Sequence, residues 1–182
     1  MEKKERKDAL RQYQRYLKLQ KGFTANTLDA YLRDVQKLLA YLKNEQKDPL
    51  EVTIDDLEHF SASLHDLGIA PSSQARILCG VRSFYRFLLL DGWIDNDPAE
   101  LLEAPKQGEH LPEYLTTAEV DRLEAAIDLS KAEGHRNRAI IEVLFSCGLR
   151  VSELVNLPMS NLYLDEGFIR VTGKGRKERL VP

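Results

Sequence analysis

Several features that define common protein classes are scarce in these 182 residues. Only two cysteines occur, Cys79 and Cys147, and neither belongs to a metal-ligand spacing or a disulfide framework, so we expect both to be small core residues in a reducing environment. No apolar run approaches the roughly 20 residues that span a bilayer. Residues 1–7 are mostly charged and no apolar stretch follows them, so we expect no secretory signal, no membrane contact and a cytoplasmic location.

The chain also lacks an excess of positive charge, with a formal net charge of −3. This value does not exclude nucleic-acid binding, because affinity for phosphate depends on local patches. Residues 1–50 hold 12 Lys and Arg against 7 Asp and Glu, whereas residues 51–100 hold 3 against 9. The pattern is compatible with a DNA-facing side, although an ordinary charged surface is the simpler interpretation.

Helical periodicity dominates the first hundred residues. Four apolar stripes at a spacing of three and four residues predict four amphipathic helices that share one core. The stripes begin near Leu10, Leu28, Ile54 and Leu78. Breakers separate them, and Thr24 and Thr53 stand where helix N-caps are expected, with Asp56 completing a capping box.

The character of the chain changes at residues 95–112, which are polar and bounded by prolines. Beyond them, the pattern predicts helices that begin after Thr116 and at residues 135–147 and 150–156, then strands at 162–164, at 168–172 and from Leu180. We therefore predict a mainly α-helical protein with a four-helix domain at 1–104 and a linker at 105–112. An incomplete α+β domain with a small antiparallel sheet would follow at 113–182.

Arg150 follows a helix-terminating glycine and opens the short helix, with Glu153 three residues further on. A guanidinium fixed at this position can hold two phosphate oxygens and oppose the charge of a pentacoordinate transition state. Glu153 could orient that arginine or a neighbouring strand. The simpler interpretation is a surface ion pair of little consequence.

Lys174 lies between Gly173 and Gly175, in a turn between two strand-like runs. A lysine there can reach a phosphate, and it can donate a proton when desolvated among other cations. Arg176, Lys177 and Arg179 extend the basic run and suit contacts to a DNA backbone. A charged hairpin tip is the simpler interpretation, and the spacing excludes a phosphate-binding P-loop.

The joint occurrence of GlyLeuArgValSerGluLeu (148–154) and GlyLysGlyArgLysGluArgLeuValPro (173–182) resembles the tyrosine recombinases, specifically their Xer-type branch. The resemblance extends over nearly the whole chain and implies an N-terminal four-helix, SAM-like core-binding domain. It also implies that Arg150 is the first catalytic arginine, Glu153 its acidic companion and Lys174 the hairpin lysine, with Lys177 as the second candidate for the lysine.

The same resemblance implies DNA contacts on two helices of the N-terminal domain. Thr24 to Asp34 is similar to the opening of one DNA-clamping helix, and Ser72 to Leu88 is similar to another. The implied contact residues are Asn26, Thr27, Arg33, Ser72, Ser73, Arg76 and Arg82. Plain N-capping is an equally good interpretation of Thr24, Ser72 and Ser73.

The resemblance implies strand exchange at a double-stranded recombination site through a 3′-phosphotyrosyl intermediate, without a metal or another cofactor. The family's second motif, His-x-x-Arg followed by a nucleophilic tyrosine, is absent, and all seven tyrosines precede Gly173. We therefore expect a fragment that is inactive and monomeric alone, whereas the complete protein would act as a tetramer on DNA. A non-catalytic DNA-binding module and a helical adaptor protein are the alternatives.

Overall fold

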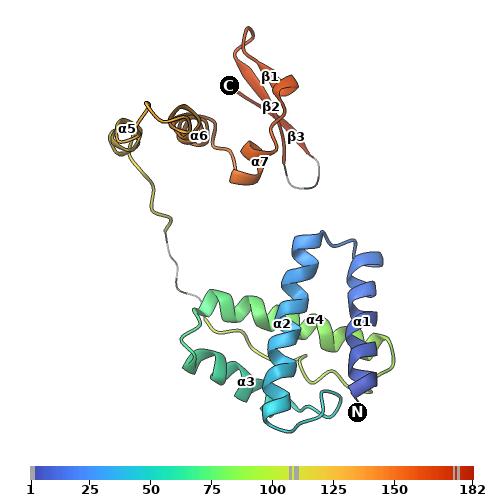
Figure 1. Ribbon diagram of the computed structural model, residues 1–182. Helices are drawn as coiled ribbons and strands as arrows, with labels where there is room; N and C mark the ends of the chain where they lie inside the picture. Colours follow the sequence, from blue (N-terminus) through green and yellow to red (C-terminus); the bar gives the residue numbers. More distant parts are fainter. Residues whose placement is uncertain (1–2, 107, 109–110, 174, 176) are drawn as a thin grey trace. The chain divides into compact units, whose positions relative to one another are not determined.

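The computed structural model describes residues 3–106, 108, 111–173, 175 and 177–182, and Figure 1 labels its helices and strands. The chain divides into two compact units, Met1–Glu109 and His110–Pro182. Each unit has its own packing and is described by itself.

The first unit contains four helices. They are α1 (Lys3–Leu19), α2 (Ala25–Asn44), α3 (Ile54–Asp66) and α4 (Pro71–Leu90). Thr24 caps α2 by accepting a hydrogen bond from the backbone N–H of Thr27, and Thr53 forms a reciprocal capping box with Asp56 at the start of α3. These caps satisfy N–H groups that have no partner inside a helix, so they fix where each helix begins.

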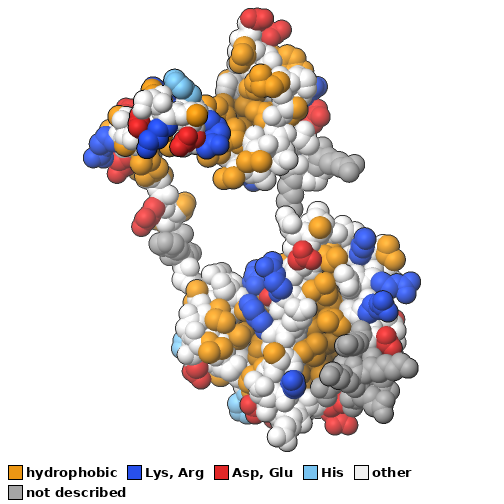
Figure 2. Space-filling view, viewed as in Figure 1, with side chains coloured by type: hydrophobic (Ala, Val, Ile, Leu, Met, Phe, Trp, Pro, Cys, Tyr) orange, Lys and Arg blue, Asp and Glu red, His pale blue; other side chains and the backbone are white. Residues whose placement is uncertain are grey.

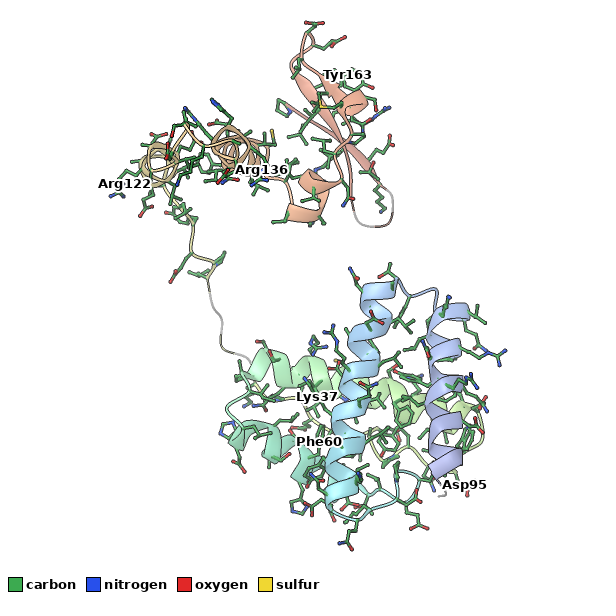
Figure 3. The ribbon with its side chains drawn as sticks, viewed as in Figure 1. Lys37, Phe60, Asp95, Arg122, Arg136 and Tyr163 are labelled. Carbon is green, nitrogen blue, oxygen red and sulfur yellow. The ribbon has the colours of Figure 1, made fainter. Side chains whose placement is uncertain are left out.

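The core of the first unit lies around α4, which contacts each of the other three helices. Leu38, Leu57, Leu78 and Tyr85 are fully buried there, and Phe60, labelled in Figure 3, is 2% exposed. Burying one such side chain contributes about 1.5–3 kcal/mol. Because all four helices give residues to one cluster, the unit has a single core.

The second unit combines short helices with a small sheet. Its elements are α5 (Thr117–Ala125), α6 (Gly134–Cys147), α7 (Val151–Val155), the 3-10 helix η1 (Met159–Asn161), β1 (Leu162–Tyr163), β2 (Phe168–Thr172) and β3 (Glu178–Val181). The strands are antiparallel in the order β1-β2-β3, and Val171 of β2, which pairs with Arg179 of β3, is buried. The sheet places the β2–β3 turn directly after Thr172.

These elements confirm the predicted fold class of a mainly helical chain with a small antiparallel sheet. The prediction that Cys79 is a core residue is wrong, because Cys79 is exposed on α4 and Cys147 is only partly buried. The bounds of the predicted linker stay a prediction. Among the described residues, no helix has the combined length and apolar character that crossing a membrane requires.

Candidate active site

Arg150 is positioned by the junction between α6 and α7. Gly148 ends α6 with a φ of 58°, in the left-handed region that glycine adopts without strain. Arg150 then has extended backbone angles and serves as the N-cap residue of α7. The predicted stop at Gly148 and helix start at Arg150 are therefore confirmed.

Glu153 is the centre of the cluster, and its carboxylate accepts four hydrogen bonds. Arg150 donates from its backbone N–H (2.9 Å) and from Nη1 (2.8 Å), while Arg179 donates from Nη1 (3.0 Å) and Nη2 (2.8 Å). The Glu153 side chain is only 4% exposed. The Arg179 guanidinium, followed by the Arg150 backbone, holds the pKa of Glu153 far below its usual range, so this carboxylate stays ionised.

Arg179 connects the β-sheet to α7 by binding the carboxylate of Glu153. It lies on β3, whereas Glu153 lies on α7, so the bidentate pair joins the end of the β2–β3 hairpin to the helix that follows Arg150. Gly173 closes the turn with a 2.7 Å hydrogen bond from its N–H to the carbonyl of Lys177. A Cβ at Gly173 would lie 3.2 Å from Oε1 of Glu153, so a larger residue would crowd the pair.

The arrangement leaves one cationic group available to an anion. The side chain of Arg150 is 68% exposed and that of Arg179 is 38% exposed, whereas the shared carboxylate is buried. Two guanidinium groups around one carboxylate carry a net charge of +1. The guanidinium of Arg150 is oriented by a buried acid and is still exposed to solvent. Such a group is suited to binding phosphate oxygens.

Lys174 and Arg176 lie outside the described residues, so their predicted roles stay predictions. Lys177, the second candidate for the lysine, is exposed on the hairpin. Within the described part of the chain, no group of three His, Cys, Asp or Glu residues is arranged to hold a metal ion.

The predicted DNA contacts on α2 lie on its first three turns. Asn26 is exposed, whereas Thr27 is half-buried and shares a 2.9 Å hydroxyl contact with Thr24. The exposed Arg33 donates from Nε to the carbonyl of Asp29. The capping interpretation of Thr24 is therefore confirmed, and the DNA contacts stay predictions.

The predicted contact residues on α4 differ in their exposure and in the hydrogen bonds that they form. Ser72 and Ser73 are exposed, and the capping interpretation is wrong for both because Ala70 is the N-cap residue and no side chain caps α4. Arg76 forms a bidentate ion pair with Asp34 of α2, at 2.7 and 2.9 Å. Arg82 donates to the carbonyl of Leu102 and so holds the segment after α4 against this helix.

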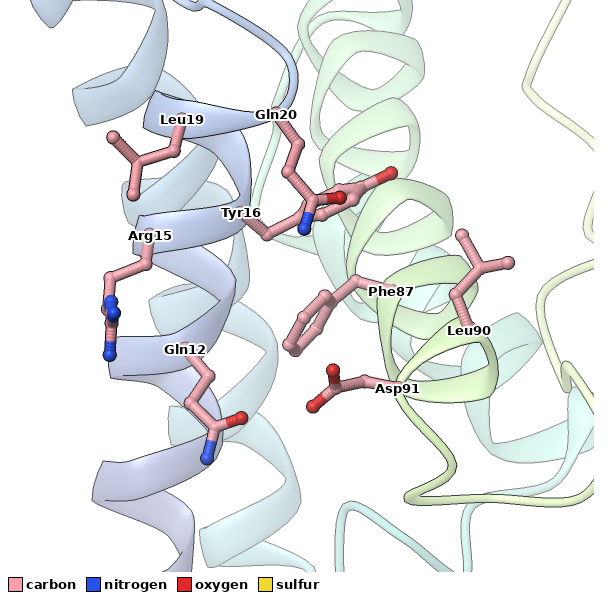
Figure 4. A pocket seen from close by; sticks show the side chains of 8 residues that line it. All are labelled: Gln12, Arg15, Tyr16, Leu19, Gln20, Phe87, Leu90 and Asp91. Carbon is pink, nitrogen blue, oxygen red and sulfur yellow. The ribbon is translucent and has the colours of Figure 1, made fainter.

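A groove lies between α1 and the end of α4 (Figure 4). Its floor contains Tyr16 and Phe87, whose ring centroids lie 5.2 Å apart. Its rim includes Arg15 and Asp91. Since the groove lies at the last turn of α4, it is separate from those predicted DNA contacts that lie in the first two turns of that helix.

Two interactions of the candidate sites were not predicted from the sequence. Arg179 was interpreted only as part of a basic run, and the burial of Asp34 beside Arg76 was not foreseen. The partners are 26 and 42 residues apart in the chain, respectively.

Comparison with known proteins places this chain near integrases and recombinases. Residues 10–92 match the family described as "Phage integrase, N-terminal SAM-like domain", and residues 113–182 match "Phage integrase family". Tyrosine recombinase XerD of Listeria monocytogenes is 38% identical over 177 residues, which are 96% of this chain and 60% of the relative. XerD of Proteus mirabilis is 42% identical over 164 residues, covering 90% of this chain and 52% of the relative.

Solved structures show the same fold at lower identity. A lambda integrase tetramer bound to a Holliday junction superposes with a TM-score of 0.77 at 21% identity, over 96% of this chain and 49% of that chain. The Tn1549 transposon integrase in complex with a circular intermediate DNA gives a TM-score of 0.66 at 16% identity, over 96% and 57% of the two chains. The chain thus spans about 60% of the length of the first Listeria relative and less of the other relatives named here.

Proposed function

Because the chain belongs to the phage integrase family of tyrosine recombinases, we propose that it is the DNA-binding and phosphate-holding part of a site-specific recombinase. The substrate would be a double-stranded recombination site, bound by Asn26, Thr27, Arg33, Ser72, Ser73, Arg76 and Arg82 of the first unit and by Arg176 and Lys177 of the second. The biological setting would be chromosome dimer resolution or DNA integration.

In the proposed reaction, a tyrosine hydroxyl attacks the scissile phosphate and a 5′-hydroxyl leaves, which gives a 3′-phosphotyrosyl link. The 5′-hydroxyl of the partner strand then attacks this link and releases the tyrosine. Bond energy is conserved in the link, so the reaction needs no nucleotide hydrolysis. We place the tyrosine in the part of the complete protein that this chain does not span.

The role of Arg150 is to hold the non-bridging oxygens of that phosphate. Negative charge grows on these oxygens in the transition state, and a pre-oriented cation stabilises it without reorganisation. Glu153 keeps the Arg150 guanidinium in one orientation, and Lys174 would protonate the leaving 5′-oxygen.

One observation carries the catalytic part of this proposal. The Glu153 carboxylate is 4% exposed, while the Arg150 side chain that it binds is 68% exposed. An ordinary surface ion pair would leave both partners in water and would orient neither strongly. A buried acid that presents an exposed arginine instead supports a binding role for the guanidinium.

The test uses the complete protein and a nicked recombination site that traps the covalent intermediate. Arg150→Ala should lower the rate of phosphotyrosyl formation by about a hundredfold or more, the size expected from losing one donor to a developing oxyanion. The matched control is Arg122→Ala, because Arg122 is an exposed arginine on α5. The control should cleave at the wild-type rate, and normal cleavage by Arg150→Ala would remove that residue from the mechanism.

A non-catalytic DNA-binding module is the second candidate, and the cationic side chains of the first unit favour it because they require no residue of the second. The complete protein would then bind its site and form no covalent intermediate.

We also propose that complete protomers assemble on DNA, whereas this chain alone is monomeric. Sedimentation of the chain with and without a duplex would test both statements.

A further inference from the structure

The helices α2 and α4 are in close contact at Gly80. A Cβ built on Gly80 would lie 2.7 Å from Cβ of Asp34 and 3.0 Å from its Oδ2, which is closer than such atoms pack. Glycine inside a helix costs about 0.5–1 kcal/mol relative to alanine. The chain therefore carries a helix-weakening residue at the position of α4 that contacts Asp34.

The carboxylate admitted by Gly80 binds Arg76, which lies one turn earlier on the same face of α4. Two parallel bonds of 2.7 and 2.9 Å join Nη1 and Nη2 of Arg76 to the two oxygens of Asp34. The Asp34 side chain is 1% exposed and the Arg76 side chain is 51% exposed. The pair thus has a buried acid and a surface guanidinium, and two of the five N–H donors of that guanidinium face the acid.

Two further cations lie near this carboxylate. Arg33 and Lys37 on α2 both act on Asp34 through space, and both are exposed. Figure 3 labels Lys37, and Figure 2 shows Lys and Arg side chains gathered beside α2 where α4 crosses it. Three cations around one buried acid leave a net positive surface that suits an anion.

Stability does not explain the pair. Burying a carboxylate removes its hydration, and the attraction of one half-exposed arginine offsets this only in part. Accordingly, burial raises the pKa of Asp34 in spite of the opposing hydrogen bonds from Arg76. Folding therefore does not favour the charged form of Asp34, whereas the two bonds to Arg76 give its guanidinium a fixed orientation.

We propose that Asp34 is a positioning residue for DNA binding: it fixes the guanidinium of Arg76 so that its outer N–H groups, together with Arg33 and Lys37, hold a backbone phosphate of the duplex. The inference rests on the proposed DNA-binding function, and it adds to that function the residue that orients the arginine and a further cation, Lys37. Asp34 itself would not touch DNA.

The experiment compares two substitutions that each remove one negative charge from α2. Asp34→Asn keeps the shape of the side chain and removes the charge that orients Arg76. Asp29→Asn is the matched control, because Asp29 is an exposed acid on the same helix. Affinity of this chain for a mixed-sequence DNA duplex is measured over a series of salt concentrations.

Charge alone predicts that both substitutions strengthen binding. We expect the opposite for Asp34→Asn, a loss of about tenfold at low salt, the size of one charge-assisted hydrogen bond. The slope of log K against log salt should also shrink by about 1 in magnitude, the value for one phosphate contact. Asp29→Asn should bind as tightly as the wild type or more tightly.

A second background separates positioning from a structural role. In the presence of Arg76→Ala, Asp34→Asn should cause no further loss, because the residue acts only through Arg76. An equal loss in that background, or binding by Asp34→Asn as tight as that of the control, would overturn the inference. If Asp34→Asn does not fold, Arg76→Lys is tested in its place, because lysine keeps the positive charge but lacks the planar guanidinium. Undiminished affinity and an unchanged salt slope in that variant would also overturn the inference.

These outcomes are distinct from failure of the proposed function. If the wild-type chain shows no salt-dependent affinity for the duplex, DNA binding by this chain is wrong and the positioning role falls with it. If the wild type binds and Asp34→Asn behaves like Asp29→Asn, only the positioning role is wrong.

Discussion

Replacing Gly80 by alanine is the most direct test of how closely α2 and α4 pack. The added Cβ would lie 2.7 Å from Cβ of Asp34, and that atom cannot move without its backbone. Either the two helices separate or the bidentate pair between Asp34 and Arg76 is distorted. The perturbation therefore acts on the packing of the first unit and on the ion pair together.

The expected magnitude follows from two opposing effects. Overpacking a tight contact costs about 1–3 kcal/mol, and the upper part of that range applies because the contacted atom is attached to the backbone of α2. Alanine gains about 1 kcal/mol over glycine in a helix interior. The net expectation is a loss of about 2 kcal/mol, which for a domain of this size lowers the melting temperature by roughly 10 °C.

Urea denaturation of the chain, followed by far-UV circular dichroism, measures this loss. Cys79→Ala is the matched control because Cys79 is the preceding residue of α4 and is exposed, so alanine gains helix propensity there without a clash. The control should be unchanged or slightly more stable. A Gly80→Ala protein as stable as the control would refute the close approach of the two helices and remove the physical basis of the buried Asp34.

Two further predictions concern single hydrogen-bonding groups. Tyr13→Phe should lower the free energy of unfolding by about 1 kcal/mol, because the buried Tyr13 hydroxyl donates a 2.9 Å hydrogen bond to Ser83. Urea denaturation would measure this loss, and no loss would mean that the bond contributes nothing to stability. Glu153 has a pKa well below 4.5, so its contribution to stability is complete above that pH and is lost as the pH falls toward the lowered pKa. Glu153→Gln should therefore flatten the acid dependence of amide hydrogen exchange in α7 below about pH 5, whereas an unchanged profile would contradict the role of this carboxylate.

Local signals in the sequence predicted the elements that depend on local physics. The capping box of Thr53 and Asp56 was predicted correctly because its partners are three residues apart, and the end of α6 was predicted from Gly148 alone. Cys79 was assigned to the core from the average behaviour of cysteine. Its position directly after Leu78 turns it about 100° away from the buried stripe, and the helical period decided its exposure.

The interactions that organise both candidate sites could not be predicted in this way. Nothing local indicates that Arg179 binds Glu153 rather than solvent, because the pair forms only once β3 is paired with β2 and α7 has packed nearby. The same holds for Asp34 and Arg76, which meet because α2 and α4 cross at a glycine. The resemblance to tyrosine recombinases identified Arg150 and Glu153 together but gave no reason for the burial of the acid.

In both candidate sites, a buried carboxylate orients an exposed arginine, but the net charge of the bonded groups differs. In the first unit, Asp34 binds a single arginine, Arg76, so the pair is neutral. The positive charge there comes from exposed neighbours such as Lys37. In the second unit, Glu153 is shared by Arg150 and Arg179, so the cluster itself retains a positive charge at its exposed arginine.

This difference fits two distinct tasks. Binding a duplex requires charge that is spread over the surface and exchanged with counterions, and such charge is screened by salt. Stabilising a transition state requires a cation fixed beside one phosphate before the reaction begins. The dispersed cations of the first unit suit the former task, and the single arginine that the buried Glu153 orients suits the latter.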